Sequence, residues 1–154
     1  MLSQEDFKKI ENTTREFFEK IGIEGDIEIA SPKEKTVPIY IETDTPQVLI
    51  GQKGQTLTSL QHLLKAILRK QISSEFYIDI DVNHYKEKKI KYLRELARSI
   101  ANEVSLSKKE MALEPMPAYE RRVIHMELAG RSDVTTESIG EEPERKVVIK
   151  PYSQ

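Results

Sequence analysis

The chain of 154 residues carries a formal net charge of −2, with 38% hydrophobic and 32% charged residues and neither Cys nor Trp. The lack of Cys excludes disulfides, thiolate metal sites and a cysteine nucleophile, and the length suits one compact domain or two small ones. No apolar run approaches the roughly 20 residues of a membrane helix. The acidic start Met1–Asp6 does not resemble a signal peptide, so we expect a cytoplasmic protein without membrane insertion.

The basic charge is concentrated in two segments. Residues 45–74 contain four basic residues and no acidic one, and residues 84–110 contain eight basic and four acidic residues. Residues 1–44, in contrast, sum to −5. Because a phosphate ligand responds to the local field rather than to the net charge, this distribution favours a nucleic acid as ligand.

The N-terminal segment predicts a helix followed by two strands. Ser3 and Asp6 resemble a capping box, apolar residues then recur at helical spacing, and Gly22 is a natural stop. We therefore expect a helix over residues 3–21. Apolar residues alternate with polar ones over residues 27–41, around a central loop, which predicts two antiparallel strands.

A Gly-x-x-Gly loop stands between two predicted helices. Pro46 opens one helical turn, the loop Gly51–Gly54 follows, and an amphipathic helix continues to about residue 71. The apolar face that this helix is expected to bury consists of Leu57, Leu60, Leu63, Leu64, Ile67 and Leu68. A third strand follows over residues 76–82.

The loop has the chemistry of a backbone clamp. Gly51 and Gly54 let the chain turn tightly and approach a ligand, while Gln52 and Lys53 can donate hydrogen bonds. The helix behind the loop directs N–H groups and its positive dipole end toward it. KH domains clamp about four backbone nucleotides with such a loop. The alternative is a plainly solvated Lys53, which the lack of acidic residues in this segment disfavours.

Two further basic residues, Lys65 and Arg69, lie on the helix behind the loop. We expect them, together with the basic side chains of residues 86–98, to add unspecific attraction for a phosphate backbone.

The second half of the chain predicts a long helix, a strand, a short helix and a hairpin. Asn83 can cap the long helix, whose buried stripe runs from Ile90 to Val104 and whose other faces are largely basic. No Gly- or Pro-rich linker precedes it, so two domains, residues 1–82 and 83–154, would be joined stiffly. The remaining elements are expected over residues 108–116, 118–128, 134–139 and 146–149.

Arg121 and His125 lie four residues apart on the predicted short helix, with Arg122 beside them. The pair shares a helical face and can hold a phosphate between a guanidinium and an imidazole. Spacing alone favours a plainer interpretation, because an i, i+4 pair arises easily on any helix. In that interpretation Arg121 pairs with a nearby Glu and His125 is a surface or capping residue.

Motifs for catalysis are absent from the sequence. The three His residues are scattered, with no H-E-x-x-H pattern and no Cys, so we expect neither a metal nor a cofactor. There is no Walker loop, no nucleophile elbow and no pair of carboxylates placed for acid–base work. We therefore expect that the protein is not an enzyme. A nuclease would need an acidic metal cluster and is disfavoured.

Two segments resemble known domains. Residues 48–57 resemble the signature of a bacterial type II KH domain, and residues 114–125 resemble the Arg-x-x-x-His motif of the R-3-H single-stranded nucleic-acid-binding domain. Residues 135–145 resemble the hairpin that closes that domain in the bacterial Jag (SpoIIIJ-associated) family. The resemblance covers nearly the whole chain. It implies an α+β fold, with the order α-β-β-α-α-β for the KH domain and α-β-α-β-β for the R-3-H domain.

Resemblance to the Jag family implies binding of single-stranded RNA, and leaves binding of single-stranded DNA open. At the matching positions, Gly51 to Gly54 would clamp the backbone, and Arg121 with His125 would form a second site toward which the strand runs. An aromatic content of 6% predicts few exposed rings for stacking, so base choice is expected to rest on hydrogen bonds and groove shape.

The family resemblance also implies a biological setting. Its members are linked to post-transcriptional control of RNA and to cell elongation and division, and they pair with a small separate KH protein; a homodimer is the other arrangement considered. Many members carry a Jag-type domain and a charged linker ahead of the KH domain, whereas this sequence opens on the first KH helix. This start puts membrane-proximal tethering in doubt, and Met1 favours a naturally short form over a trimmed chain.

A protein-interaction adaptor is the competing hypothesis. In it the KH fold mainly supplies a dimer face, the acidic surface of residues 1–44 docks a partner, and nucleic acid is incidental.

Overall fold

The computed structural model describes residues 2–152. It divides into two compact units, one that ends at Lys86 and one that begins at Glu87, and each unit has its own hydrophobic core.

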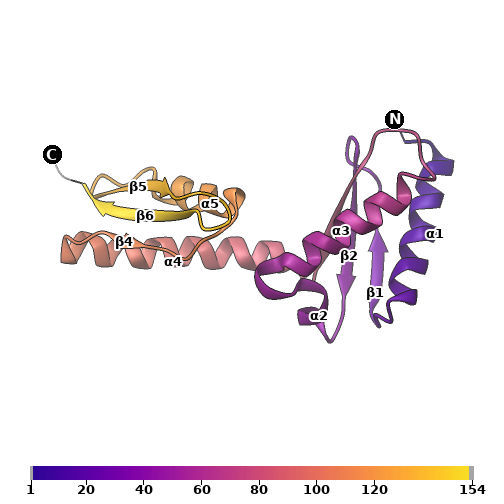
Figure 1. Ribbon diagram of the computed structural model, residues 1–154, viewed down its shortest axis with the longest axis horizontal. Coiled ribbons are helices and arrows are strands. Elements are labelled where there is room, and N and C mark those ends of the chain that lie inside the picture. The colour runs from indigo at the N-terminus through magenta and orange to yellow at the C-terminus, as the bar shows by residue number, and fades with distance from the viewer. Residues whose placement is uncertain (1, 153–154) are drawn as a thin grey trace. The chain divides into compact units, whose positions relative to one another are not determined.

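The first unit has the predicted order α-β-β-α-α-β, with an added 3-10 turn, η1, between its second and third helices (Figure 1). Its elements are α1 (Gln4–Lys20), β1 (Asp26–Ile29), β2 (Thr36–Glu42), α2 (Pro46–Ile50), η1 (Gln52–Gly54), α3 (Gln55–Leu68) and β3 (Tyr77–Val82).

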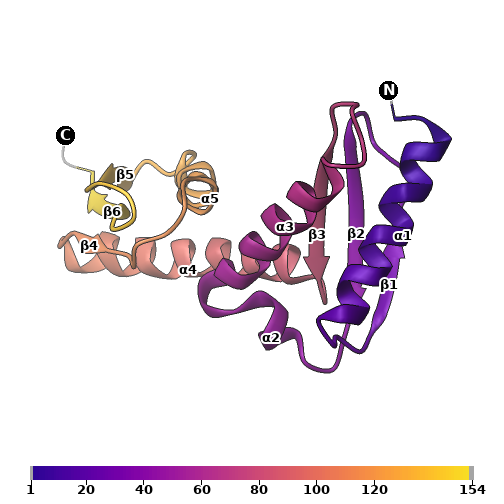
Figure 2. The same cartoon turned by 45° about the vertical axis from the view of Figure 1, so that its right-hand side comes forward.

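The three strands form one sheet in the order β1-β2-β3, in which β2 is antiparallel to β1 and parallel to β3. Side chains alternate between its two faces. Val37, Ile39 and Ile41 of β2 are at most 1% exposed and pack on the covered face, beneath α1 and α3 (Figure 2). The opposite face carries charged and aromatic side chains.

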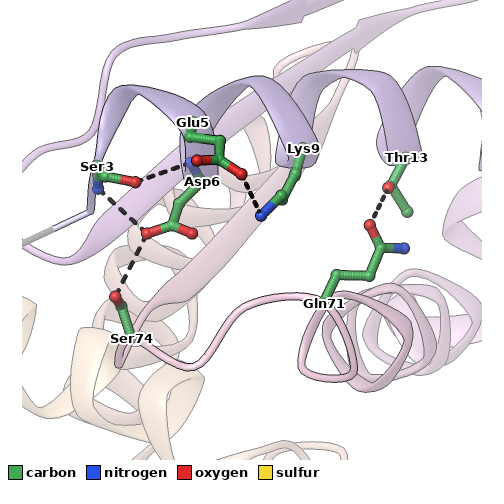
Figure 3. A network of polar contacts seen from close by, with 7 residues as sticks. All are labelled: Ser3, Glu5, Asp6, Lys9, Thr13, Gln71 and Ser74. Carbon is green, nitrogen blue, oxygen red and sulfur yellow. Dashed lines mark hydrogen bonds and ion pairs between the residues drawn. The ribbon is translucent and has the colours of Figure 1, made fainter.

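Polar contacts at the start of α1 fix the connection between α3 and β3 (Figure 3). The capping box is present, since Ser3 Oγ accepts from the Asp6 N–H and Asp6 accepts from the Ser3 N–H. The Ser74 hydroxyl also lies 3.4 Å from the Asp6 carboxylate, and the Thr13 hydroxyl donates to Gln71. These contacts hold the connection that follows α3 against α1.

The second unit has the predicted order α-β-α-β-β, and α4 begins in the last two residues of the first unit. The elements are α4 (Tyr85–Ser107), β4 (Met111–Ala112), α5 (Ala118–Leu128), β5 (Val134–Ile139) and β6 (Lys146–Pro151). The three strands form an antiparallel sheet in the order β4-β6-β5. Its core joins Ala97 and Ala101 of α4 to Ile124 of α5 and to Val147 and Ile149 of β6.

Three local predictions are wrong. Leu63 is 52% exposed, because α3 buries a narrower stripe than the apolar spacing indicates. The strand expected over residues 108–116 shrinks to Met111–Ala112, the two residues in register with β6, and Leu113 adds one backbone hydrogen bond to Val147. Asn83 does not cap α4; its side chain bonds both the N–H and the C=O of Thr43, and Asp81 accepts from the Lys86 N–H instead.

Candidate nucleic-acid interface

The Gly51–Gly54 loop has a backbone that only glycine tolerates at its first position. Gly51 has φ 68° and ψ −173°, a region essentially reserved for glycine, and a Cβ built there would lie 2.0 Å from Thr56 Oγ1. Lys53 and Gly54 also have positive φ, 53° and 78°. Three of the four loop residues thus have positive φ, which produces a sharp bend between α2 and α3.

The bend presents uncompensated positive charge to solvent. Gln52 and Lys53 are exposed, and among the described residues Lys53 has no ion-pair partner. Gly54 caps α3 without a side-chain hydrogen bond, and the first turn of α3 contains no acidic residue. The N–H groups and dipole of a 14-residue helix therefore face the loop with no carboxylate of that turn to neutralise them.

A tyrosine that the sequence did not single out supports the loop. Gly54 is buried, and the nearest atom to a Cβ built on it is Tyr85 Oη at 3.3 Å. Tyr85 packs on the first core from the start of α4. The sequence signal was slight, namely a tyrosine two residues after the position expected to cap α4.

Lys65 and Arg69 lie at the other end of α3 from the loop. Eleven residues separate Lys65 from Gly54, which corresponds to roughly 16 Å along a helix axis. The Lys65 ammonium is 4.3 Å from the ring centroid of Tyr77, and Arg69 is exposed. The structure thus places these two cations on the same helix as the loop without bringing them to it.

Arg121 is engaged by its own chain. It is 7% exposed; its Nε donates to the Met116 carbonyl at 3.1 Å, and its Nη2 forms an ion pair with Glu142 in the β5–β6 connection. Arg122, beside it, is exposed.

His125 is held between two hydroxyl groups of β5. Its Nδ1 lies 2.7 Å from Thr136 Oγ1 and its Nε2 lies 2.7 Å from Ser138 Oγ. Burial lowers the pKa of His125 below its ordinary value of 6.5, and the positive charge of Arg121 lowers it further. The neutral imidazole has one donor and one acceptor, so one hydroxyl donates to the ring and the other accepts from it.

Arg121 and His125 therefore share one face of α5, as their spacing indicated, and both fasten the β5–β6 hairpin to this helix. Arg121 holds the connection between the strands, and His125 holds β5 itself. No local sequence pattern predicts Glu142, Thr136 or Ser138 as partners, because they lie 11 to 21 residues from Arg121 and His125 along the chain.

The expectation of few exposed aromatic rings is wrong. Five of the six tyrosines are at least 38% exposed, because four lie on helix or sheet faces turned away from the two cores and Tyr152 follows the end of β6. These are Tyr40, Tyr77, Tyr92, Tyr119 and Tyr152.

Within residues 2–152 no cluster of His, Asp or Glu is suited to hold a metal ion. No helix in the same span combines the length and hydropathy required to cross a lipid bilayer.

Comparison with known protein families identifies both units by class. The KH domain model matches residues 8–110 and the R-3-H domain model matches residues 91–151, so the chain is a KH domain followed by an R-3-H domain. The chain belongs to the Jag family, which confirms the predicted relationship.

Curated relatives named RNA-binding protein KhpB match over most of this chain. The proteins from Clostridium symbiosum, Bacillus subtilis and Lactiplantibacillus plantarum are 38%, 35% and 34% identical over 86%, 85% and 84% of the chain. The matched regions cover 60%, 64% and 40% of those relatives. The chain thus spans less than two thirds of their length.

Proposed function

We propose that this protein binds single-stranded RNA and that the Gly51–Gly54 loop clamps the sugar–phosphate backbone. The observation that carries the proposal is the exposed, cation-bearing bend at the open N-terminus of α3. The names of the KhpB relatives and the pairing of a KH domain with an R-3-H domain support the same ligand.

In this proposal the loop recognises the backbone and not the bases. Left-handed backbone at Lys53 and Gly54 forms the bend whose peptide groups would meet a phosphate, while glycine at positions 51 and 54 leaves room for Thr56 and Tyr85 behind the bend. The helix dipole and the Lys53 ammonium supply attraction that is independent of sequence. Lys65 and Arg69 extend this attraction to the far end of α3.

The R-3-H unit would add a second phosphate contact. Arg122 is exposed and can reach a phosphate directly, whereas Arg121 contributes only where a phosphate exchanges with the Glu142 carboxylate. His125, neutral and bonded to two hydroxyls, would hold the hairpin that carries Glu142 and not the phosphate charge.

Substitution of the loop's two central residues tests the clamp. The double change Gln52→Asp with Lys53→Asp should weaken binding of a short single-stranded RNA at least tenfold, because it places two carboxylates where phosphates would lie. A matched control is Gln4→Asp with Lys8→Asp, which makes the same charge change on exposed positions of α1. Equal binding by both variants, with unaltered circular dichroism, would refute the clamp.

A protein-interaction adaptor is the second candidate, favoured by the uncovered face of the first sheet. A cavity of about 700 Å³ opens beside it, away from the Gly51–Gly54 loop, and Asp26, Glu28 and Glu42 contribute to its lining. The salt dependence of RNA binding separates the two functions. Contact with about five phosphates predicts a log–log slope near −3.5, whereas a flat response would favour the adaptor.

We further propose that the protein acts in the cytoplasm as a post-transcriptional regulator linked to cell elongation and division. A small separate KH protein or a second copy of the chain would be its partner. The family relationship supports this setting, and sequencing of transcripts crosslinked to the protein in cells tests it. Crosslinks that are not enriched above those of the Gln52→Asp, Lys53→Asp variant would contradict it.

A further inference from the structure

Two exposed tyrosines of the second unit, Tyr92 and Tyr119, are connected to each other through contacts with Lys89 and Glu120. Tyr92 on α4 is 55% exposed and Tyr119 on α5 is 51% exposed. The Lys89 ammonium lies 5.8 Å from the ring centroid of Tyr92 and 3.9 Å from Glu120 Oε2. The other oxygen of Glu120 accepts from the Tyr119 hydroxyl at 3.2 Å. Both rings are therefore linked through the Lys89–Glu120 ion pair, which joins α4 to α5.

The centre of this arrangement is a buried charge. Glu120 is 4% exposed, and a carboxylate so buried requires a compensating cation and hydrogen bonds. The Lys89 ammonium is the compensating cation, and the Tyr119 hydroxyl donates one hydrogen bond to the Glu120 carboxylate. Because Lys89 also approaches the Tyr92 ring, the same ion pair connects both aromatic side chains and restrains their positions.

Basic side chains flank the two rings. Lys88 and Lys91 are exposed on α4 next to Tyr92, and Arg122 is exposed on α5 one turn from Tyr119. Arg94 and Arg98, further along α4, are already paired with Glu127. Exposed aromatic rings set among cations are the combination that binds single strands, because bases stack on the rings while the cations attract the backbone.

We propose that Tyr92 and Tyr119 form a base-stacking platform for single-stranded RNA on the α4–α5 surface. This inference rests on the proposed function and deepens it, since in that proposal the Gly51–Gly54 loop binds the sugar–phosphate backbone and makes no contact with the bases. The platform gives the second unit a contact to bases that does not depend on Arg121 or His125.

Loss of the rings should weaken binding only when the strand has bases. In the full chain, Tyr92→Ala with Tyr119→Ala should weaken binding of a short oligouridine at least fivefold, which is the low end of what the loss of a single stacked base costs. The same variant should bind the matching abasic strand as the unsubstituted protein does. The log–log salt slope should stay unchanged, because no phosphate contact is removed. Tyr92→Phe with Tyr119→Phe keeps both rings and should retain the affinity for oligouridine.

A second measurement reads the stacking directly. The chain lacks Trp, so its intrinsic fluorescence comes from tyrosine, and oligouridine should quench it in the unsubstituted protein but much less in the double-alanine variant. Tyr152→Ala is the matched control, since Tyr152 is 59% exposed in the same unit but lies beside residues at the other end of α5. It should bind as the unsubstituted chain does.

The outcomes separate this inference from the proposed function. Unaltered oligouridine affinity in the double-alanine variant, with the loop variant still impaired, would overturn the platform alone. Equal losses on the abasic strand and on oligouridine would also overturn it, because the effect would then not involve bases. Failure of the unsubstituted chain to bind any single strand would overturn both.

Discussion

The guanidinium of Arg121 donates to the carboxylate of Glu142, and this ion pair ties α5 to the connection between β5 and β6. The two side chains differ in burial: that of Arg121 is 9% exposed and that of Glu142 is 58% exposed. A carboxylate and a phosphate present similar acceptor oxygens to an arginine. Glu142 therefore occupies the position at which Arg121 would receive a phosphate.

Removal of the Glu142 charge should strengthen RNA binding while weakening the fold. Glu142→Gln deletes a negative charge beside the proposed phosphate contact, and about 1 kcal/mol of lost repulsion corresponds to roughly fivefold tighter binding. The free energy of unfolding should fall by about 1 kcal/mol, because the buried Arg121 loses its ionic partner. Strand titration and urea unfolding measure the two effects. Glu144→Gln, an exposed change in the same connection, is the control; equal affinities of the two variants would place Arg121 outside the binding site.

Gly51 should be intolerant of any side chain. Gly51→Ala puts a methyl group 2.0 Å from Thr56 Oγ1 and 3.1 Å from the Thr56 backbone nitrogen, in a backbone region that strains other residues by about 1–3 kcal/mol. Gly22→Ala is the matched control, because Gly22 also has positive φ, 75°, but open space around it. We expect Gly51→Ala to lower the unfolding free energy by at least about 1 kcal/mol more than Gly22→Ala, and only Gly51→Ala to weaken RNA binding. Similar stabilities would show that the loop relaxes around a Cβ.

The Lys53→Gly variant should have a higher free energy of unfolding than the Lys53→Ala variant. A left-handed backbone costs a non-glycine residue about 1–2 kcal/mol, whereas glycine loses roughly 0.4–1 kcal/mol through the entropy of the unfolded chain. Lys53→Gly should therefore be more stable than Lys53→Ala by about 0.5–1 kcal/mol in urea unfolding. Both variants lose the same charge, so each should make the log–log salt slope of RNA binding less negative by about 0.7. An unchanged slope would mean that Lys53 contacts no phosphate.

Much of the fold could be predicted from the sequence, because interactions between residues close together in the chain determine where helices, strands and turns form. The Ser3–Asp6 capping box lies within one helical turn, alternation along a strand reports which face is buried, and Pro46 fixes the start of α2. The Gly-x-x-Gly loop was readable because positive φ has a strong residue preference.

The parts that could not be predicted depend on distant partners. Glu142 reaches Arg121 across 21 residues, and Tyr85 meets Gly54 across 31, through the fold of the chain and not through spacing. The exposure of Leu63 and of the tyrosines likewise depends on how much of each surface the neighbouring elements cover. Composition alone counted the tyrosines but gave no indication of which faces remain open.

Protonation of His125 should destabilise the second unit below neutral pH. Its pKa is lowered in the fold by burial and by Arg121, so the unfolded chain binds more protons than the folded one between the folded pKa and about 6.5. Stability is therefore complete above pH 6.5 and is lost as the pH falls through the folded pKa, when the ring can no longer accept from Thr136 or Ser138. The unfolding free energy should fall between pH 7.5 and pH 5.5 in the unsubstituted protein and in His62→Gln, whose exposed side chain serves as control. His125→Gln should be less stable at pH 7.5 and should lose this dependence; an equally steep fall in that variant would assign the effect to another group.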